Sequence, residues 1–234
     1  MSDKLDALNA RGPRLTSHEW VKLRLRRAIF AGAYAPGSRL VQTELAEAFQ
    51  VSVTPVREAM RDLISEGLIR SDPHHAATVR ELDVAEALEV NELRLMLEPF
   101  AVRRAAERIT AGEIENLEQI QRNMERTTDN QTWLELNNHF HLAVIGAARS
   151  PQAAGILHNL LQTSTFYFAA ALRVSGGNRA KSIREHWDLI DALRAHDAEL
   201  AASITAGHVS SSLELENRLD SLLSGSTTDE TAQV

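Results

Sequence analysis

The side chains with the most distinctive chemistry in this sequence are histidines in its second half. Asn137 and His141 lie four residues apart, so on a helix they project from the same face. His186 and His208 follow at an interval of 22 residues. Three imidazoles and one oxygen ligand that converge inside a helical bundle would suit Zn²⁺, Ni²⁺ or a similar borderline ion. With one coordination position open, that ion would also bind an anionic ligand directly.

The other histidines of the second half are interpreted as structural. A single histidine on an apolar helix is usually a hydrogen-bonded core or boundary residue. This interpretation applies to His139, His158 and His196. His139 is two residues from His141 and therefore points to a different side of the helix.

A second set of candidate functional residues lies in the first third of the chain. Apolar residues recur there at helical spacing in two short segments joined by a tight turn; they are Leu45, Ala46, Phe49, Val56, Met60, Leu63 and Ile64. Ser52 or Thr54 can cap the second helix, and Pro55 fits its first turn. Arg57 and Arg61 lie one turn apart and point away from the apolar stripe. A short helix, a turn and a helix with exposed arginines is the geometry that reads the major groove of DNA.

The surrounding elements would hold this helical pair in place. Thr16 and Glu19 have the capping-box pattern that opens a helix. The basic face of that helix is either solvated or in contact with the DNA backbone. Beyond Gly67, residues 68–70 and 78–80 have the pattern of two short strands, which predicts a β-hairpin.

After this hairpin the sequence predicts only helices. Helix starts are expected at Asn130 and at Ser150-Pro151, and Pro99 is expected to kink or bound the first long helix. Capping boxes are expected at three pairs of positions: Asp83 and Glu86, Thr110 and Glu113, Ser182 and Glu185. No β-like alternation of useful length is present, so an antiparallel bundle of about six or seven helices is predicted.

Composition limits the class of protein. The 234 residues include no cysteine, which excludes disulfides, thiol nucleophiles and thiolate metal sites. No apolar run reaches the ~18 residues that would span a membrane, and the polar N-terminus has no signal-peptide pattern. A cytoplasmic location is therefore expected, without membrane contact.

The net charge of −7 is divided unevenly along the chain. Residues 1–81 hold 12 basic and 10 acidic side chains, a net charge of +2, whereas residues 82–234 hold 13 and 22, a net charge of −9. The acidic part would repel phosphate, so only the N-terminal part can carry the electrostatic contacts to a nucleic acid.

The N-terminal pattern resembles the winged helix-turn-helix of GntR-family transcription regulators. The resemblance runs from about Thr16 to Glu81 and rests on five segments, Gly37–Leu40, Leu45–Glu47, Val51-Ser52, Thr54–Ala59 and Glu66–Ile69. It implies contacts of Arg57 with bases or phosphate, of Arg39 with backbone phosphate, and positioning by Ser52 and Thr54. The full set of candidate DNA-binding residues is Arg39, Ser52, Val53, Thr54, Arg57, Arg61 and His75.

Two departures from that family affect the reading of DNA. The family commonly has arginine where this chain has Val53, and valine offers only apolar contact, for example to a thymine methyl. The wing tip usually has Arg-Gly where this chain has His75 and Ala76, which puts minor-groove contact in doubt. His74 and His75 are neighbours on the wing and point to opposite sides, so a solvated tip is favoured over a metal pair.

The second half resembles the FCD ligand-binding domain of the FadR subgroup within the same family. The resemblance covers about Leu82 to Leu222 and rests on Glu92–Glu98, Asn137–His141, Glu185-His186 and Gly207-His208. It implies a metal site of Asn137, His141, His186 and His208, although the family commonly has aspartate at position 137. The amide oxygen of asparagine is a weaker ligand without the negative charge.

Arginines near this site are candidates to bind the carboxylate of an effector. The planar fork of a guanidinium matches a carboxylate well. The two candidates are Arg94 and Arg173, with surface salt bridges as the alternative for each. Phe166, Tyr167 and Phe168 are expected to fill the core of the bundle.

The predicted fold class is mainly α, with an N-terminal winged helix-turn-helix, a small β-hairpin wing and a C-terminal all-α antiparallel helical bundle. Residues 1–15 are expected to be a flexible tail and residues 16–81 a DNA-binding domain. Residues 82–222 are expected to bind the effector and dimerise, and residues 223–234 to form a disordered tail.

The predicted function is a DNA-binding transcription regulator rather than an enzyme. A homodimeric repressor would bind a pseudo-palindromic operator, and a small organic acid beside a zinc or nickel ion would control it. Two alternatives stay open. One is a zinc-dependent hydrolase that uses His141, His186 and His208, although no hydrolase motif is present. The other is a dimeric ligand-binding protein without DNA binding, which Val53 and His75 favour.

Overall fold

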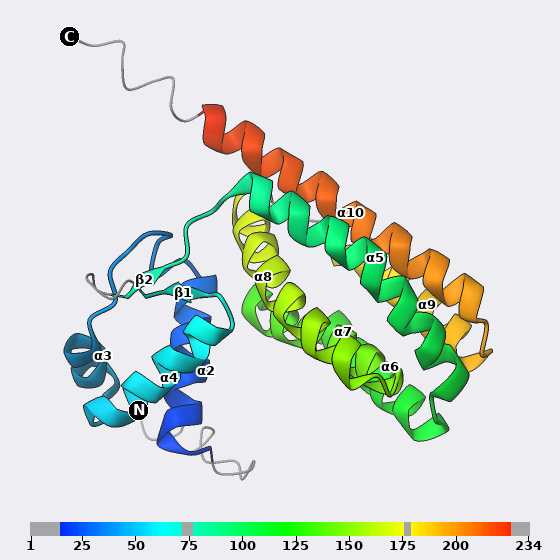
Figure 1. Cartoon of the computed structure of the whole chain (residues 1–234), viewed down its shortest axis with the longest axis horizontal. Helices are drawn as coiled ribbons and strands as arrows, with labels where there is room; N and C mark the ends of the chain where they lie inside the picture. The colour runs from blue at the N-terminus through cyan, green and yellow to red at the C-terminus, as the bar shows by residue number, and fades with distance from the viewer. Residues whose placement is uncertain (1–14, 72–76, 176–178, 226–234) are drawn as a thin grey trace.

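The computed structural model describes residues 15–71, 77–175 and 179–225 (Figure 1). Most of the predicted N-terminal tail, most of the predicted C-terminal tail and the wing tip with His74, His75 and Ala76 lie outside these residues. The expectations for those segments stay predictions.

The N-terminal part consists of three helices and a two-stranded sheet. Its elements are α2 (Ser17–Phe30), α3 (Gln42–Phe49), α4 (Val53–Ser65), β1 (Ile69–Arg70) and β2 (Thr78–Val79). The strands pair antiparallel, with Ile69 opposite Val79, and Arg39 forms an additional bridge to Thr78. Most of the predicted apolar positions form the core, since Val56 and four others are buried, whereas Phe49 and Ile64 are half-buried and pack against it. The other four are Leu45, Ala46, Met60 and Leu63.

The turn between α3 and α4 lies where it was predicted, but α4 lacks the predicted capping hydrogen bond. Gln50 ends α3 in the left-handed conformation, with a φ of 55°. Ser52 occupies the N-cap position of α4, but its hydroxyl makes no capping hydrogen bond, and Thr54 lies inside the helix. Both hydroxyls are therefore exposed at the start of α4.

The C-terminal part is a helical bundle (Figure 1). Its elements are α5 (Val84–Arg108), α6 (Ala111–Arg126), α7 (Asn130–Ala147), α8 (Pro151–Ser175), α9 (Arg179–Arg194) and α10 (Ala198–Gly225). Pro99 lies inside α5 and does not end it. Phe166 and Tyr167 are buried, as expected, whereas Phe168 is half-buried and lines a cavity beside Asn137 and His141. In the described part of the chain, no helix is long and apolar enough to cross a membrane. The predicted fold class is confirmed.

Local capping signals located three of the helices correctly and failed at one. Thr16 and Thr110 each form a complete capping box with the glutamate three residues later. Asp83 caps α5 through the backbone N–H groups of Ala85 and Glu86. The box predicted at Ser182 and Glu185 is wrong, because α9 already begins at Arg179.

Arginines join the two parts of the molecule. Arg27 on α2 donates two hydrogen bonds of 2.6 Å to the carboxylate of Glu135 on α7. Arg173 on α8 donates to the backbone oxygen of Phe30 at 2.6 Å. Both contacts fix α2 against the bundle.

A third contact lies where the hairpin leads into α5. Arg80 is buried and donates to the backbone oxygen of Gly67 at 2.9 Å and to Glu86 on α5 at 3.1 Å. Tyr167 on α8 donates to the same carboxylate at 2.8 Å. Gly67 has a φ of +73°, and a Cβ there would lie 2.8 Å from Nη1 of Arg80, so a larger residue would be strained and would displace the guanidinium.

Replacing Glu113 by glutamine is expected to destabilise the protein more at pH 7 than in acid. The Arg149 guanidinium and the Thr110 cap hold the pKa of Glu113 at about 2, against 4.5 for the free side chain. Because the folded pKa is lowered, the carboxylate stabilises the fold above pH 4.5, and this contribution is lost as the pH falls toward 2. Solvent screening limits the effect to about 1 kcal/mol.

Urea unfolding at pH 7 and pH 3 measures this difference. Glu115→Gln is the matched control, since Glu115 is exposed on the same helix, and little change is expected. An equal loss of stability at both pH values for Glu113→Gln would contradict the assignment.

Candidate functional site

The exposed start of α4 carries the polar and basic residues predicted to contact DNA. Ser52, Val53 and Thr54 are exposed at its N-terminus, and Arg57 and Arg61 follow on its outer face. The structure brings Arg39 from the preceding loop beside the two arginines, because all three line one surface cleft. Among the described residues, none of these three arginines has a carboxylate partner. Their charges are therefore available to an anionic ligand.

Three of the four basic residues of α2 pair with carboxylates of the protein itself, whereas Arg24 is exposed and lies 5.4 Å from the centre of the Trp20 ring. Lys22 pairs with Asp62 at 3.0 Å and with Glu66 at 2.8 Å, and Arg26 also pairs with Glu66. Arg27 binds Glu135 of the bundle. These pairs hold α2 against α4 and α7, and the expectation of a solvated or DNA-binding basic residue on this helix now applies to Arg24.

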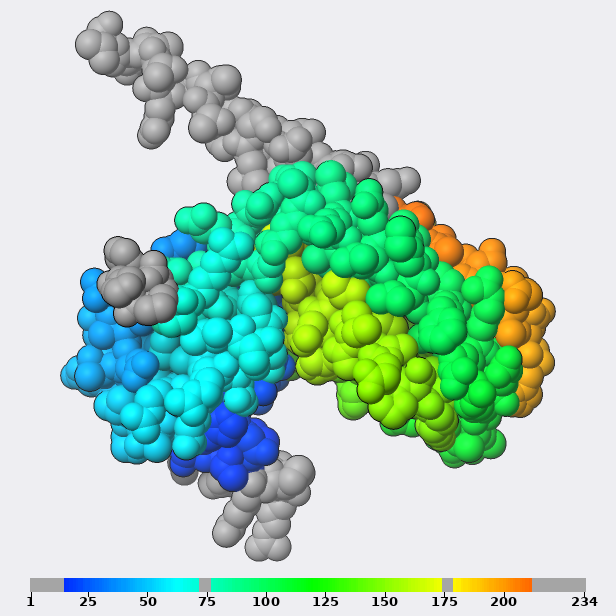
Figure 2. Space-filling model, in the orientation of Figure 1, coloured from blue at the N-terminus to red at the C-terminus, as the bar shows by residue number. Residues whose placement is uncertain are grey.

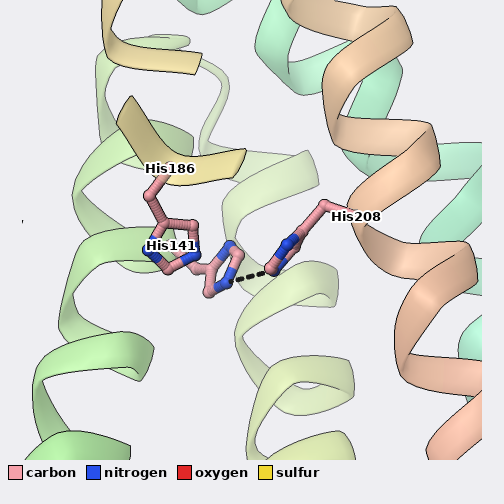
Figure 3. A group of neighbouring side chains, drawn as sticks. All are labelled: His141, His186 and His208. Atoms are coloured by element: carbon pink, nitrogen blue, oxygen red, sulfur yellow. Dashed lines mark hydrogen bonds between the residues drawn. The ribbon is translucent and has the colours of Figure 1, made fainter. Parts of the chain in front are cut away.

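Three helices of the bundle bring three histidines together (Figure 3). His141 comes from α7, His186 from α9 and His208 from α10, and one nitrogen of each lies within 4.8 Å of the others. Nε2 of His141 is 3.3 Å from Nε2 of His208. All three side chains are buried. Such a donor set can hold a divalent transition-metal ion.

The outer nitrogens of two imidazoles bind acceptors that fix their orientation. Nδ1 of His186 lies 3.1 Å from Oε1 of Gln121, and Nδ1 of His208 lies 2.7 Å from Glu185. When each Nδ1–H donates to its acceptor, the lone pair of each Nε2 points to the centre of the cluster. Metal-binding histidines have this arrangement, in which an outer acceptor selects the tautomer.

Electrostatics favours the neutral imidazole forms of His141 and His186. Burial lowers the pKa of His141 well below 6.5, and the neighbouring His208, His186 and Arg94 lower it further. Burial, followed by His208, has the same effect on the pKa of His186. A metal ion binds only the neutral form of histidine, so these shifts suit a ligand role.

Asn137 lies beside the histidines, as its spacing from His141 predicted. Both residues, with His208 and Arg94, line a cavity of about 30 Å³. Among the described residues, Oδ1 of Asn137 and Nε2 of His186 are buried without a hydrogen-bond partner. Buried polar atoms without partners are costly. The two orphaned acceptors therefore fit a site that takes a cation.

Arg94 lies on the wall of the same cavity and is 3% exposed. Its Nε donates to Glu98 at 2.6 Å, and its Nη1 donates to Asn91 at 3.1 Å and to Ser164 at 2.6 Å. Its Nη2 makes no hydrogen bond to a described residue. That group is the donor left for a ligand.

Arg173 does not belong to this site. It is absent from the cavity wall, and its guanidinium packs over Gly32 and binds the Phe30 oxygen. The expectation of an effector-binding role is corrected for this residue, since its donors serve the junction between α8 and α2. Arg173 also has no carboxylate partner among the described residues, so the surface salt bridge is not formed either.

Several residues of the site were not predicted. Gln121 and Glu185 hold the histidines, Ser164 holds Arg94, and Ser182 lines the cavity. Glu185 precedes His186 in the sequence, but its capping-box spacing led to a different role. Gln121 and Ser164 have no local signal, because each faces a partner from a distant helix.

The comparisons with known families cover most of the chain. Residues 18–79 match the model of bacterial regulatory proteins of the gntR family, and residues 89–211 match the FCD domain. The first match contains the α4 surface, and the second contains the three histidines.

Similar proteins of known name are transcription regulators. YdhC of Bacillus subtilis is 27% identical over 189 residues, which are 79% of this chain and 84% of that protein. The galactonate operon transcriptional repressor of Escherichia coli is 27% identical over 221 residues, 85% of this chain and 96% of that protein.

A solved structure has the same arrangement. The structure of McbR from E. coli has a TM-score of 0.73 and 26% identity, and the match covers 88% of this chain and all of that one. With its winged helix, its histidine-containing bundle and both family matches, the chain belongs to the GntR family of bacterial transcription regulators, in the FadR-like group with a C-terminal FCD domain, and it is not an enzyme.

Proposed function

We propose that this protein is a homodimeric repressor whose affinity for its operator is controlled by a small carboxylate bound beside a divalent metal ion. Residues 16–81 would read the DNA, and residues 82–222 would bind the effector and dimerise, in the cytoplasm. The observation that carries the proposal is the convergence of three buried imidazoles, two of which, His141 and His208, line a cavity with Arg94 in its wall. Repression is the mode named for the galactonate operon relative.

The DNA-binding half of the proposal depends on the arginines without partners. Arg57 and Arg61 lie on the outer face of α4, the face with which a recognition helix contacts base edges. Arg39 lies beside α4, where it would contact phosphates of the DNA backbone. Val53 is 40% exposed at the tip of α4 and would offer apolar contact only. Specificity would therefore depend more on Arg57 than on the first residue of the helix.

Replacing Arg57 by alanine is expected to weaken binding to the operator by about ten- to a hundredfold and to relax its sequence preference, because a base contact is worth about 1–3 kcal/mol. Arg39→Ala is expected to weaken binding to all DNA sequences alike. It is also expected to reduce the slope of the logarithm of the binding constant against the logarithm of the salt concentration by about one, because a phosphate contact is lost. Fluorescence anisotropy with a duplex selected by the wild-type protein from random DNA measures both effects.

Arg108→Ala is the control, because Arg108 is exposed at the far end of α5. Unchanged binding of Arg57→Ala would contradict the proposed reading surface. Absence of any salt-dependent binding of the wild-type protein to duplex DNA would contradict DNA binding itself.

In the metal-binding half of the proposal, the Nε2 atoms of His141, His186 and His208 hold the ion together with Oδ1 of Asn137. The ion would supply positive charge to an anionic effector. Glu185 and Gln121 would keep the imidazoles in the ligating tautomer. Asn137 has no negative charge, so the site stays more cationic than one with aspartate, which favours an anion in the open position.

A carboxylate is the effector class that this site favours. Nη2 of Arg94 can donate to it, while Glu98 keeps part of the guanidinium charge neutralised. The cavity of about 30 Å³ has room for little more than a water molecule. A carboxylate metabolite would therefore enter only when side chains around the cavity move.

Two helices connect the cavity to the DNA-reading part. On α7, Asn137 lines the cavity, and Glu135 binds Arg27 of α2. On α8, Ser164 binds Arg94, and the adjacent Thr163 lies 3.4 Å from Nη1 of Arg80. A movement of either helix would disturb the junction, so an effector that binds one arrangement better would change operator affinity by its coupling free energy.

Metal content tests the site directly. Protein purified without an affinity tag is expected to contain about one equivalent of a divalent transition metal per chain. His141→Ala is expected to lose it, because one of three imidazole ligands is removed. His139→Ala is the matched control, since His139 is exposed on the same helix. The measurement is elemental analysis before and after incubation with Zn²⁺ or Ni²⁺ and dialysis.

A wild-type protein that binds neither ion after incubation would contradict the metal site. Equal loss of metal in His139→Ala and His141→Ala would indicate a structural effect of substitution in α7. The variant Asn137→Asp is expected to hold Zn²⁺ more tightly than the wild-type protein in competition with a chelator, because a carboxylate replaces an amide ligand.

A further inference from the structure

The wall of the cavity beside the histidines contains a polar residue that the proposed ion and carboxylate leave unused. From α7, Leu134, Asn137, Asn138 and His141 line this cavity, at the spacing of one helix face. Asn137 and His141 would bind the ion. Asn138 is therefore left for another part of a ligand.

The side-chain oxygen of Asn138 is an acceptor without a donor. Oδ1 is buried and has no hydrogen-bond partner among the described residues. Oδ1 of Asn137 is in the same condition, but the proposed ion would bind it. A buried acceptor without a donor is costly, and such atoms in folded proteins usually have a partner. A bound molecule that donates a hydrogen bond would be that partner for Asn138.

Neighbouring hydroxyl groups of the wall are directed elsewhere. Thr165 on α8 lines the same cavity and donates to the backbone oxygen of Leu161 at 2.7 Å. Ser164 accepts from Nη1 of Arg94 at 2.6 Å. No described residue accepts the proton of Ser164, so this hydroxyl can still donate to a ligand. The wall thus offers an acceptor on α7 and a donor on α8.

The small volume of the cavity brings these two groups to the same part of a ligand. The cavity measures about 30 Å³, and both Asn138 and Ser164 belong to its wall. Figure 2 shows one face of the bundle, where side chains of α5 and α8 form a closed surface. A hydroxyl group donates one hydrogen bond and accepts up to two. It can therefore donate to Asn138 and accept from Ser164 at the same time.

We infer that Asn138 recognises a hydroxyl group of the effector, so that the effector is a short hydroxy acid. Its carboxylate lies toward the ion and Nη2 of Arg94, and its hydroxyl donates to Oδ1 of Asn138. The inference rests on the carboxylate effector of the proposed function and names its chemical class. Asn138 is then the residue that distinguishes a hydroxy acid from the corresponding unsubstituted acid.

Other substituents fit this part of the wall less well. An ammonium group would also donate to Asn138, but its positive charge would be buried beside the Arg94 guanidinium and the ion. A second carboxylate has only acceptors and would place them against the Asn138 oxygen. A methyl group would leave that oxygen without a donor. A neutral donor is the group that matches both the charge and the hydrogen bonds of the cavity.

The hydroxyl group lies close to the carboxylate in this arrangement. Asn137 and Asn138 are consecutive, with Cα atoms about 3.8 Å apart, so the ion and the hydroxyl meet neighbouring residues of one helix. Leu134, Leu161 and Phe168 form the apolar part of the wall, against which the carbon atoms of the ligand would pack. The inferred ligand therefore has a short carbon chain with both polar groups at one end.

Calorimetric titration of the full chain with glycolate and with acetate tests the inference. The two acids have the same carbon chain and differ by one hydroxyl group. The wild-type protein is expected to bind glycolate about tenfold more tightly than acetate, which corresponds to about 1.4 kcal/mol. Glycine has an ammonium group in place of the hydroxyl and is expected to bind no more tightly than acetate.

Two variants separate recognition by Asn138 from a structural effect. Asn138→Leu keeps the size of the side chain but removes the acceptor, so glycolate is expected to bind only as tightly as acetate. Asn138→Asp keeps an acceptor and adds a negative charge, so both acids are expected to bind more weakly with the preference for glycolate retained. Asn159→Leu is the control, because Asn159 is exposed on α8, and it is expected to behave like the wild-type protein.

The ratio of the two affinities is the decisive quantity, since a disturbed fold would weaken both acids alike. Equal binding of glycolate and acetate by the wild-type protein, or a preference that survives Asn138→Leu, would overturn the inference. The carboxylate effector of the proposed function would stand in both cases. A wild-type protein that binds neither acid would instead refute the carboxylate effector itself, and the role of Asn138 with it.

Discussion

Burial of polar groups inside an apolar bundle is the constraint on which the rest of the structure depends. Three imidazoles, the Arg94 guanidinium and the Glu98 carboxylate all lie in the interior, where an unpaired polar group is costly. Neighbouring residues therefore supply hydrogen-bond partners to these groups. Glu98 and Ser164 bind the guanidinium, and Gln121 and Glu185 bind the outer imidazole nitrogens. Nε2 of His186 has no hydrogen-bond partner among the described residues, and Nε2 of His141 lies 3.3 Å from Nε2 of His208, so the cluster can take a cation.

The same constraint gives single helices more than one role. α7 carries a cavity residue and a junction residue within three positions, and α8 carries them at adjacent positions. Because a helix moves as a rigid element, a movement that alters its contacts at one residue also alters its contacts at the other residues. The cavity and the junction between the two parts of the molecule are close because they share α7 and α8.

Arginine illustrates how burial and partners decide what a charge does. Arg27, Arg80 and Arg94 each bind a carboxylate and hold elements together. Arg39 and Arg57 have no carboxylate partner in the described chain and line a surface cleft. The N-terminal part has nearly balanced charge overall, yet the cleft lined by Arg39, Arg57 and Arg61 is cationic, because its acidic residues Asp62 and Glu66 pair with Lys22 and Arg26 instead. Net charge alone hides this separation.

The sequence by itself determined which segments are helices or strands and where most of the helices begin. It also supplied the two sets of candidate residues, one for contact with DNA and one for a metal ion. Periodicity and capping act over a few residues, so Thr110 and Asp83 were located correctly. The pairing of Asn137 with His141 followed from helical spacing alone. Partners far apart in the chain could not be read in this way. Glu185 binds a histidine 23 residues away, and Arg173 binds an oxygen 143 residues away. Only the tertiary structure decided these roles, because the free energy of such a contact depends on which helices the fold places side by side.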